Sequence, residues 1–493
     1  MEVLDMEATR QAIEFFLNGK PRQMEVSPHS TVLELLRGPL ALPGTKEGCA
    51  EGDCGACTVV IGEKKKKNES ENIFSYRAVT SCLMLAPQLD GKHLLTIEGL
   101  AEGEHLHPIQ QAILDDHATQ CGFCTPGVVM SLLALFLDNP QPSQEDLLAA
   151  LEGNLCRCTG YVAIKSAGEH LRTDWLLEKI KAKDLRPAYL EEVEKILGAE
   201  KEKKVLSIRE GEKSFHAPRT AAQLRHLLSI SDSKLLNGGT DITVAIKKHG
   251  APIRNLIDLT SIEGMSEVRI GCEEVVIGGA ATLRKVAREV EGVLPVLSEA
   301  IGKMASHQVR TLGTLAGNLA NASPISDTAP LLLALGAVLH LEGPDGSRKV
   351  PLSEFYRGYK QIDLGKEEWI SEIRLPLSGE KFHHFEKVSK RRALDIATVN
   401  GAISLTLDDR RILAAKVAFG GVAAVPFLAE KTSASLLGRE WNLETVEFAS
   451  TVALEEMRPI GDVRGSSTYR KDLIEGILIK HFLACVEEKG WEQ

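Results

Sequence analysis

The alternation of apolar and polar residues predicts a strand-rich beginning to the chain. The apolar run 13–17 is followed by Asn18-Gly19, a pair typical of a type I′ turn, so we expect a hairpin with its return strand around 24–26. Ser30 is expected to cap a short helix over 31–37 that ends at Gly38. Further strands are expected at 58–61, 74–80 and 94–97, with a solvated lysine-rich loop at 64–67. This segment should form a small mixed sheet with one helix.

Residues 105–172 change to a helical pattern. Helices are expected to begin at Pro108, at Thr125-Pro126 and at Ser143, where Ser143 and Asp146 resemble a capping box. The second helix is apolar nearly all round over 128–137, so it should be buried. A fourth helix is expected after Thr159-Gly160. Four short helices in succession predict a compact bundle.

The second half of the chain alternates strands and helices. It follows a charge-rich stretch, 176–204, which we interpret as a linker with a solvated helix at 190–197. A strand at 234–239 should lead through a glycine turn into a helix around 244–248, and an apolar helix is expected at 329–335. Strands are expected at 382–390, 398–407 and 414–419, with helices toward the C-terminus. This pattern predicts α/β domains.

Size and composition restrict the class of protein. A chain of 493 residues is too long for one core and should hold about three or four domains. The net charge of −10 argues against nucleic acid or an anionic membrane as the main partner. The first twenty residues lack the features of a signal peptide, and no apolar stretch approaches the length of a membrane span. Ten cysteines in such a chain indicate reduced, metal-binding thiols in the cytoplasm.

The first group of cysteines has the spacing of a plant-type [2Fe–2S] site. Cys49, Cys54 and Cys57 follow the pattern C-x4-C-x2-C, and Cys82 comes later. Gly48, Gly52 and Gly55 are expected to let the loop curl through positive φ angles and to let backbone N–H groups approach the sulfurs. A zinc site usually has paired short spacings, and disulfides need an oxidising compartment, so both alternatives are less favoured.

A second group lies at two predicted helix starts. Cys121 and Cys124 precede the second helix, and Cys156 and Cys158 precede the fourth. Two helix N-termini brought together would stabilise an anionic cluster. The C-x-C pair favours a second [2Fe–2S] centre because two ligands one residue apart can hold one iron, whereas C-x2-C alone could be redox-active or bind zinc. Cys272 and Cys485 are expected to be buried small apolar residues.

Two segments of the second half suit a phosphate-containing cofactor. The strand–glycine–helix turn at 234–241 can place backbone N–H groups along a pyrophosphate, although it is not G-x-G-x-x-G and a structural turn explains it equally well. The stretch 311–327 is rich in small and hydroxyl residues that could grip a large polar ligand, and a capped surface loop is the alternative.

With these motifs in place, the chain resembles the small, iron–sulfur and FAD subunits of bacterial xanthine dehydrogenases in the molybdenum hydroxylase family. The resemblance covers nearly the whole length. Both cysteine patterns occur in the family's order, followed by Asn-Gly-Gly-Thr-Asp at 237–241, Gly-Asn at 317–318, Ser-Pro-Ile-Ser-Asp at 323–327 and Ser-Lys-Arg…Asp-Ile at 389–396.

The resemblance implies a multidomain α+β protein with four domains. They are a β-grasp ferredoxin-like domain at 1–98, a four-helix [2Fe–2S] domain at 99–175, an α/β FAD-binding domain of the PCMH/CO-dehydrogenase-flavoprotein type at 208–378, and a C-terminal flavoprotein α/β domain at 379–493. A linker at 176–207 joins the second domain to the third.

It also implies site residues. Cys49, Cys54, Cys57 and Cys82 would bind one [2Fe–2S] cluster, and Cys121, Cys124, Cys156 and Cys158 the other, the one nearer molybdenum in the family. The FAD pyrophosphate would be wrapped by Leu235, Leu236, Asn237, Gly238, Gly239, Thr240, Asp241 and Ile242. Thr314, Gly317, Asn318, Asn321, Ser326 and Asp327 would hold the ribityl and phosphate region, and Ile370 and Lys387 would line the flavin. No catalytic side chain is predicted.

The implied activity is electron transfer. A molybdopterin-binding large subunit would oxidise hypoxanthine and xanthine, in an α2β2 heterotetramer, and electrons would pass through the two clusters to FAD and on to NAD+, with oxygen left open as the acceptor. The chain stops where the molybdopterin portion of fused relatives begins, so a partner polypeptide is expected to supply it. The alternatives are the same subunit of an aldehyde, nicotinate or aromatic acyl-CoA hydroxylase, a stand-alone iron–sulfur flavoprotein diaphorase, and a non-enzymatic cluster scaffold or redox sensor.

Overall fold

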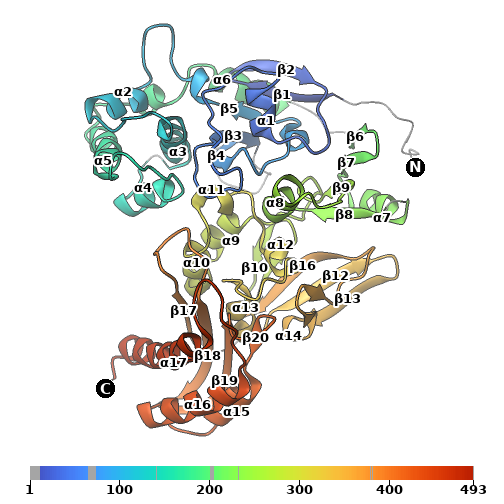
Figure 1. Cartoon of the computed structure of the whole chain (residues 1–493), viewed down its shortest axis with the longest axis vertical. Helices are drawn as coiled ribbons and strands as arrows, with labels where there is room; N and C mark the ends of the chain where they lie inside the picture. The colour runs from blue at the N-terminus through green and yellow to red at the C-terminus, as the bar shows by residue number, and fades with distance from the viewer. Residues whose placement is uncertain are drawn as a thin grey trace. The chain divides into compact units, whose positions relative to one another are not determined.

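The structure, a computed structural model shown in Figure 1, describes residues 12–64, 74–139, 141–199, 205–230, 232–377, 379 and 381–491. It separates into two compact units. The first unit comprises Met1–Ser261 and Ser306–Leu312, and the second comprises Ile262–Ala305 and Gly313–Gln493. Most of the predicted lysine-rich loop, 65–67, lies outside the described residues.

The first unit begins with a five-stranded mixed sheet in the order β2-β1-β5-β3-β4. β1 and β5 are parallel, and the other neighbours are antiparallel. The helix α1 and the 3-10 turns η1 and η2 accompany the sheet, whose apolar faces supply a buried core. The elements are β1 (Ile13–Leu17), β2 (Lys20–Met24), α1 (Val32–Arg37), β3 (Thr58–Lys64), β4 (Phe74–Thr80), η1 (Ala86–Leu89), β5 (His93–Leu95) and η2 (Ile97–Gly99).

Two details of this sheet differ from the prediction. The hairpin turn at Asn18-Gly19 is confirmed, with φ of 48° and 82°, but the return strand begins at Lys20 rather than near residue 24. A two-residue turn pairs Leu17 directly with Lys20, so strand pairing starts at once. The cap of α1 is Thr31 and not Ser30, because Thr31 and Glu34 form a reciprocal capping box.

The four predicted helices of the next segment are confirmed. They are α2 (Pro108–Asp115), α3 (Thr125–Asp138), α4 (Gln144–Leu151) and α5 (Val162–Leu176), and the Ser143–Asp146 capping box is present. After η3 (Ala182–Leu185) comes α6 (Leu190–Ala199), which was expected to be solvated. This expectation was wrong on one face: Val193 and Leu197 are buried against Phe16, since the helix is amphipathic.

A four-stranded sheet completes the first unit, in the order β6-β7-β9-β8. Its β7, β9 and β8 are parallel, and α7 and α8 lie beside it (Figure 1). The short helix α11 also belongs to this unit, although the chain on either side of it belongs to the other. The elements are β6 (Leu206–Glu210), β7 (Lys213–Ala217), α7 (Ala221–Ile230), β8 (Ser233–Leu236), α8 (Thr240–His249), β9 (Asn255–Asp258) and α11 (His307–Arg310).

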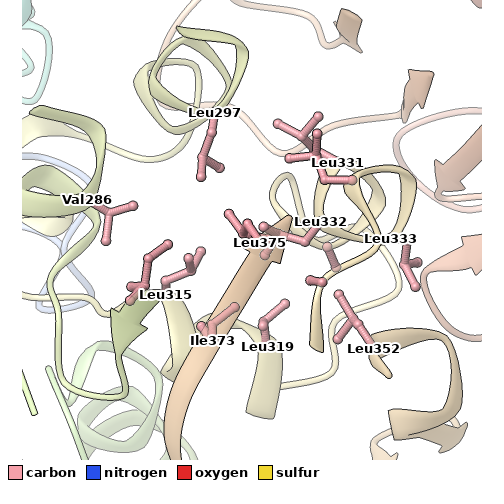
Figure 2. Packing of buried hydrophobic residues seen from close by; sticks show 14 of the residues in the cluster. Val286, Leu297, Leu315, Leu319, Leu331, Leu332, Leu333, Leu352, Ile373 and Leu375 are labelled. Atoms are coloured by element: carbon pink, nitrogen blue, oxygen red, sulfur yellow. The ribbon is translucent and has the colours of Figure 1, made fainter. Parts of the chain in front are cut away.

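The second unit starts with an antiparallel sheet ordered β10-β11-β16-β12-β13. Figure 2 shows its core, in which leucines of α12 and α13 meet Ile373 and Leu375 of β16. The elements are β10 (Val268–Ile270), β11 (Glu274–Gly278), α9 (Leu283–Val290), α10 (Pro295–Gly302), α12 (Leu315–Ala320), α13 (Ala329–Leu335), β12 (Val338–Gly343), β13 (Gly346–Pro351), α14 (Leu352–Phe355), β14 (Tyr356–Gly358), β15 (Gln361–Ile362) and β16 (Trp369–Pro376).

The unit ends with an antiparallel meander, β17-β18-β19-β20, packed against three helices. The elements are β17 (Phe382–Val388), β18 (Val399–Asp408), β19 (Arg411–Gly420), β20 (Phe427–Leu428), α15 (Glu430–Leu436), α16 (Leu443–Glu456) and α17 (Ser467–Lys489). Among the helices of the described residues, none combines the length and the apolar character that crossing a membrane requires.

Candidate functional site

The first cysteine group gathers in the first unit, where the loop before β3 meets the turn after β4. Its thiols lie in two pairs. The sulfurs of Cys57 and Cys82 are 3.4 Å apart, and Cys49 and Cys54 are joined by a side-chain hydrogen bond. Two thiolates for each of two irons is the ligand set of a [2Fe–2S] cluster, so this arrangement fits the predicted group.

The glycines of the loop act in two different ways. Gly52 and Gly55 have φ of 90° and 66°, as predicted. Gly48 does not adopt a positive φ; a Cβ at this position would lie 2.7 Å from the Cys54 sulfur, so Gly48 is needed for space. The tight loop aims N–H groups at sulfur: the amides of Cys54 and Glu51 lie 3.4 and 3.5 Å from Cys49 Sγ. Such donors stabilise a negatively charged cluster.

Pairing also changes the acidity of these thiols. Hydrogen bonding from Cys54 lowers the pKa of Cys49 to about 5, and the same bond raises the pKa of Cys54. In the second pair, the contact with Cys82 lowers the pKa of Cys57, and the pKa of Cys82 rises. In each pair one thiol is therefore made more acidic, which favours the thiolate, the form that binds metal.

The second group gathers where the helical segment begins α3 and α5. Cys124 is the N-cap of α3, and Cys121 precedes it, whereas Cys156 and Cys158 occupy the loop between α4 and α5. Cys158 Sγ lies 3.5 Å from Cys121 Sγ, and Cys124 is hydrogen bonded to Cys156. The expectation that Cys156 and Cys158 form one pair was wrong, because each loop contributes one thiol to each pair.

The donors at both places are thiols in pairs, which fits binuclear iron–sulfur clusters. Within the described part of the chain, no three His, Cys, Asp or Glu side chains are arranged to bind one ion. Four thiols in two pairs, at each of two places, match the needs of [2Fe–2S] groups. The N-terminus of the 14-residue α3 begins directly at Cys124, whereas α5 begins four residues after Cys158. One helix dipole therefore faces the second group closely.

The two remaining cysteines behave differently from each other. Cys485 lies on the buried face of α17, as predicted. Cys272 is exposed, so the expectation that it is buried was wrong. It lies in the turn between β10 and β11, where the chain reverses at the surface.

The predicted pyrophosphate segment, 235–242, belongs to the first unit. It runs from the end of β8 into α8, and Gly239 precedes the helix with φ of 78°. The Thr243 hydroxyl of α8 donates a 2.9 Å hydrogen bond to the Leu83 carbonyl, next to Cys82. Gln88 Nε2 reaches the Asn237 carbonyl at 3.4 Å. The predicted glycine turn is therefore held against the segment that directly follows Cys82.

The other predicted FAD residues belong to the second unit, where α12 organises them. The Thr314 hydroxyl accepts the Gly317 N–H at 3.0 Å and caps the helix. Asn318 Oδ1 accepts hydrogen bonds from the hydroxyls of Ser326 and Thr328, at 2.7 and 2.6 Å. Asn321, at the other end of α12, accepts from Lys360 Nζ at 2.8 Å.

Asp327 and Lys387 form a buried ion pair in the same unit. Lys387 Nζ lies 2.7 Å from Asp327 Oδ2, and Asn400 Nδ2 donates to the other oxygen at 2.9 Å. Burial raises the pKa of Asp327, and the Lys387 ammonium offsets part of this rise. Ile370 is buried in the core that α12 also joins. The structure thus brings Asn318, Ser326, Asp327 and Lys387 together in one connected group.

Sequence reasoning missed several residues that support these sites. Lys360 and Asn400 hold Asn321 and Asp327, and Asn154 and Gln308 lie between the two cysteine groups. These partners are far apart in sequence, so no local pattern could pair them. The one available signal was the position of Asn154, two residues before Cys156.

Comparison with protein families gives four matches in chain order. They are "2Fe-2S iron-sulfur cluster binding domain" at 15–87, "[2Fe-2S] binding domain" at 96–169, "FAD binding domain in molybdopterin dehydrogenase" at 209–378, and "CO dehydrogenase flavoprotein C-terminal domain" at 384–485. Two [2Fe–2S]-binding domains and an FAD-binding domain are therefore present, and the predicted multidomain α+β fold is confirmed.

Curated relatives match over nearly the whole chain. Xanthine dehydrogenase of Emericella nidulans is 30% identical over 95% of this chain and 38% of its own length. Aldehyde oxidase 2 of Macaca fascicularis is 30% identical over 96% of this chain and 39% of its own length. The chain thus spans about two fifths of the length of these relatives.

Solved structures match about half of the chain. Carbon monoxide dehydrogenase of Hydrogenophaga pseudoflava, in a form lacking the Mo-pyranopterin moiety, has a TM-score of 0.52 and 30% identity. The match covers 54% of this chain and 94% of that one. Reconstituted CO dehydrogenase of Oligotropha carboxidovorans gives 0.53 and 28%, over 55% and 97% of the two chains.

Proposed function

The chain belongs to the molybdenum hydroxylase family, and we propose that it is the electron-transfer subunit of a xanthine dehydrogenase. Electrons would come from a molybdopterin-binding large subunit that oxidises hypoxanthine and xanthine. They would pass through the second cysteine group, then the first, to FAD and finally to NAD+. When bound, iron–sulfur groups carry single electrons, and FAD collects two and returns them as hydride.

Each group of residues has a holding role in this proposal. The eight paired cysteines would bind the two clusters, and N–H groups of the 49–54 loop would stabilise the charge on the first. The turn at 235–242 would hold the FAD pyrophosphate, with Thr243 anchoring α8 beside Cys82. The network of Asn318, Ser326, Asp327 and Lys387 would hold the ribityl chain and line the flavin.

The observation that carries the proposal is the coexistence of two four-thiol sites with an FAD-binding domain in one chain. A flavoprotein without clusters would not account for the two four-thiol sites. A cluster protein without FAD would not account for the second unit. A separate large subunit agrees with the CO dehydrogenase match, because 97% of that chain corresponds to 55% of this one, which leaves no length in that chain for a molybdopterin portion. An α2β2 assembly in the cytoplasm is part of the proposal.

Anaerobic co-purification with the large subunit tests the proposal. We expect about four irons and about one FAD per chain, with xanthine-dependent reduction of NAD+. Lower iron or absent FAD would end the electron-transfer assignment. Turnover with oxygen but not with NAD+ would correct only the final acceptor.

A second candidate is the equivalent subunit of another hydroxylase. It is favoured by the matches to Aldehyde oxidase 2 and to CO dehydrogenase, which stand at the same identity as the xanthine dehydrogenases. Replacing xanthine with an aldehyde in the same assay distinguishes the two, since cofactor content would be identical. A stand-alone diaphorase would reduce dyes with NADH and show no turnover that depends on the large subunit.

A further inference from the structure

The two cysteine groups are linked by one hydrogen bond. The N–H of Leu155 donates to the carbonyl of Cys54 at 3.0 Å. Cys54 belongs to the first group, and Leu155 is bonded to Cys156 of the second. Between these two cysteines the route consists of backbone covalent bonds and a single hydrogen bond. Electronic coupling decays more slowly along such a route than across a van der Waals gap.

A buried asparagine holds this link in place. Asn154 is 3% exposed, and its Nδ2 donates to the Gly55 carbonyl at 3.1 Å. Its Oδ1 accepts from Ser131 Oγ of α3 at 2.7 Å and from Gln308 Nε2 at 3.1 Å. The Asn154 amide thus clamps the residue after Cys54 while its own chain neighbour, Leu155, bonds to Cys54. Removing the Asn154 side chain would leave its buried hydrogen-bond partners unsatisfied between the two loops.

Glycines bring the backbones together at the same place. A Cβ on Gly55 would collide with the Gly153 carbonyl, and a Cβ on Gly127 would collide with the Gly55 carbonyl. Three backbone segments therefore pack in direct contact, with only the Asn154 amide beside them. The approach of the two loops is set by this packing and by the Asn154 hydrogen bonds.

Gln308 extends the clamp to the short α11 segment. It is fully buried and donates to Ser131 Oγ at 2.9 Å and to the Ala150 carbonyl at 3.3 Å. The neighbouring Thr311 hydroxyl donates to the Ala78 carbonyl of β4 at 2.6 Å. Segment 306–312 therefore contacts both iron–sulfur domains and ties them to each other.

We propose that Asn154 is a positioning residue for electron exchange between the two clusters, and that Gln308 supports it. The inference rests on the proposed function. When bound, the clusters held by the two cysteine groups would exchange one electron at a time: the iron at the second group would be oxidised from ferrous to ferric and the iron at the first group reduced from ferric to ferrous, with no proton transferred. Asn154 touches neither iron; it keeps Leu155 N–H on the Cys54 carbonyl.

The test uses the co-purified complex with Asn154→Ala. The readout is low-temperature EPR of the fully reduced protein, in which two neighbouring paramagnetic clusters split each other's signals. We expect the splitting to shrink, each cluster to keep its own g values, and the rate of electron arrival at the first cluster to fall about tenfold. A splitting and rate equal to wild type would overturn the inference.

Two further variants keep the test decisive. Gln308→Ala removes only the outer support, so it should give a smaller change of the same sign, and it serves if Asn154→Ala fails to fold. Asn255→Ala removes a half-buried amide that bonds Ser214 and the Asp232 carbonyl in the sheet of β6 to β9. It should lower stability and leave the splitting unchanged; an equal loss of splitting in Asn255→Ala would show a general effect and overturn the role of Asn154. A wild-type complex without iron would instead refute the proposed function.

Discussion

The two cysteine sites of the first unit share paired thiols but differ in burial. In the first site, Cys57 and Cys82 are 2% and 4% exposed and pack in the core of the sheet. In the second site, Cys121 and Cys158 are exposed, with Phe123 and Val162 exposed nearby. Both sites reach a core, because Cys156 of the second site belongs to the core of the helical bundle. The difference is that two thiols of the second site are exposed, whereas no thiol of the first site is. Because the ligand chemistry is the same, we expect this difference in burial to decide how strongly each site is coupled to folding.

Removing one thiol from each site should give the largest effects and tests the difference in burial between the two sites. Cys57→Ser and Cys121→Ser should each abolish one cluster and about half of the bound iron. In the metal-free chain, Cys57→Ser should lower the free energy of unfolding by about 1–3 kcal/mol, because it buries a hydroxyl in an apolar core. Cys121→Ser should change it by less than about 0.5 kcal/mol. Urea denaturation measures both, and equal losses would contradict the difference in burial.

A matched pair of glycine substitutions gives the next largest effect. Gly55 and Gly122 both have positive φ, at 66° and 79°. A Cβ on Gly55 meets the Gly153 carbonyl, whereas a Cβ on Gly122 has nothing within 4 Å. Gly122→Ala should cost about 1 kcal/mol from backbone strain alone. Gly55→Ala should cost a further 1–3 kcal/mol or so and release iron from the first site. Similar thermal shifts for the two variants would show that the loops are not in close contact.

Acid should weaken the sheet that carries the first site. Burial lowers the pKa of His93 to about 3, well below its ordinary value of 6.5. The unfolded chain takes up a proton below pH 6.5 that the folded chain refuses, so stability is lost as pH falls from 6.5 toward 3. Between pH 6.5 and 5 the loss from His93 reaches about 2 kcal/mol. His93→Gln should flatten this slope in urea titrations at several pH values, and an unchanged slope would contradict the buried neutral state.

The smallest expected effect is kinetic. Because Cys121 and Cys158 are exposed, a chelator or mild oxidant should remove the second cluster several-fold faster than the first. Following the two EPR signals over time after adding chelator measures this directly. Binding of the large subunit would slow the loss only if it covers the second site. Faster loss of the first cluster's signal would contradict the prediction that the exposed site loses its cluster first.

The sequence predicted what depends on local spacing. Cysteine intervals, the Asn18-Gly19 turn, the Ser143 capping box and the apolar helix over 329–335 were readable because each involves residues within a few positions. What failed depends on partners distant in sequence. Which thiols pair, and why the α6 helix is half-buried, follow from contacts between separate loops and helices. The Asn154–Gln308 contact, 154 residues apart, had no local signature.

Low-temperature EPR of the anaerobically purified, dithionite-reduced chain tests the central claim most directly. Two distinct [2Fe–2S] signals are expected, together integrating to about two spins per chain. One signal should vanish in Cys57→Ser and the other in Cys121→Ser. A wild-type chain that is colourless, silent in EPR or loaded with zinc would contradict the claim that the eight paired cysteines hold two [2Fe–2S] clusters.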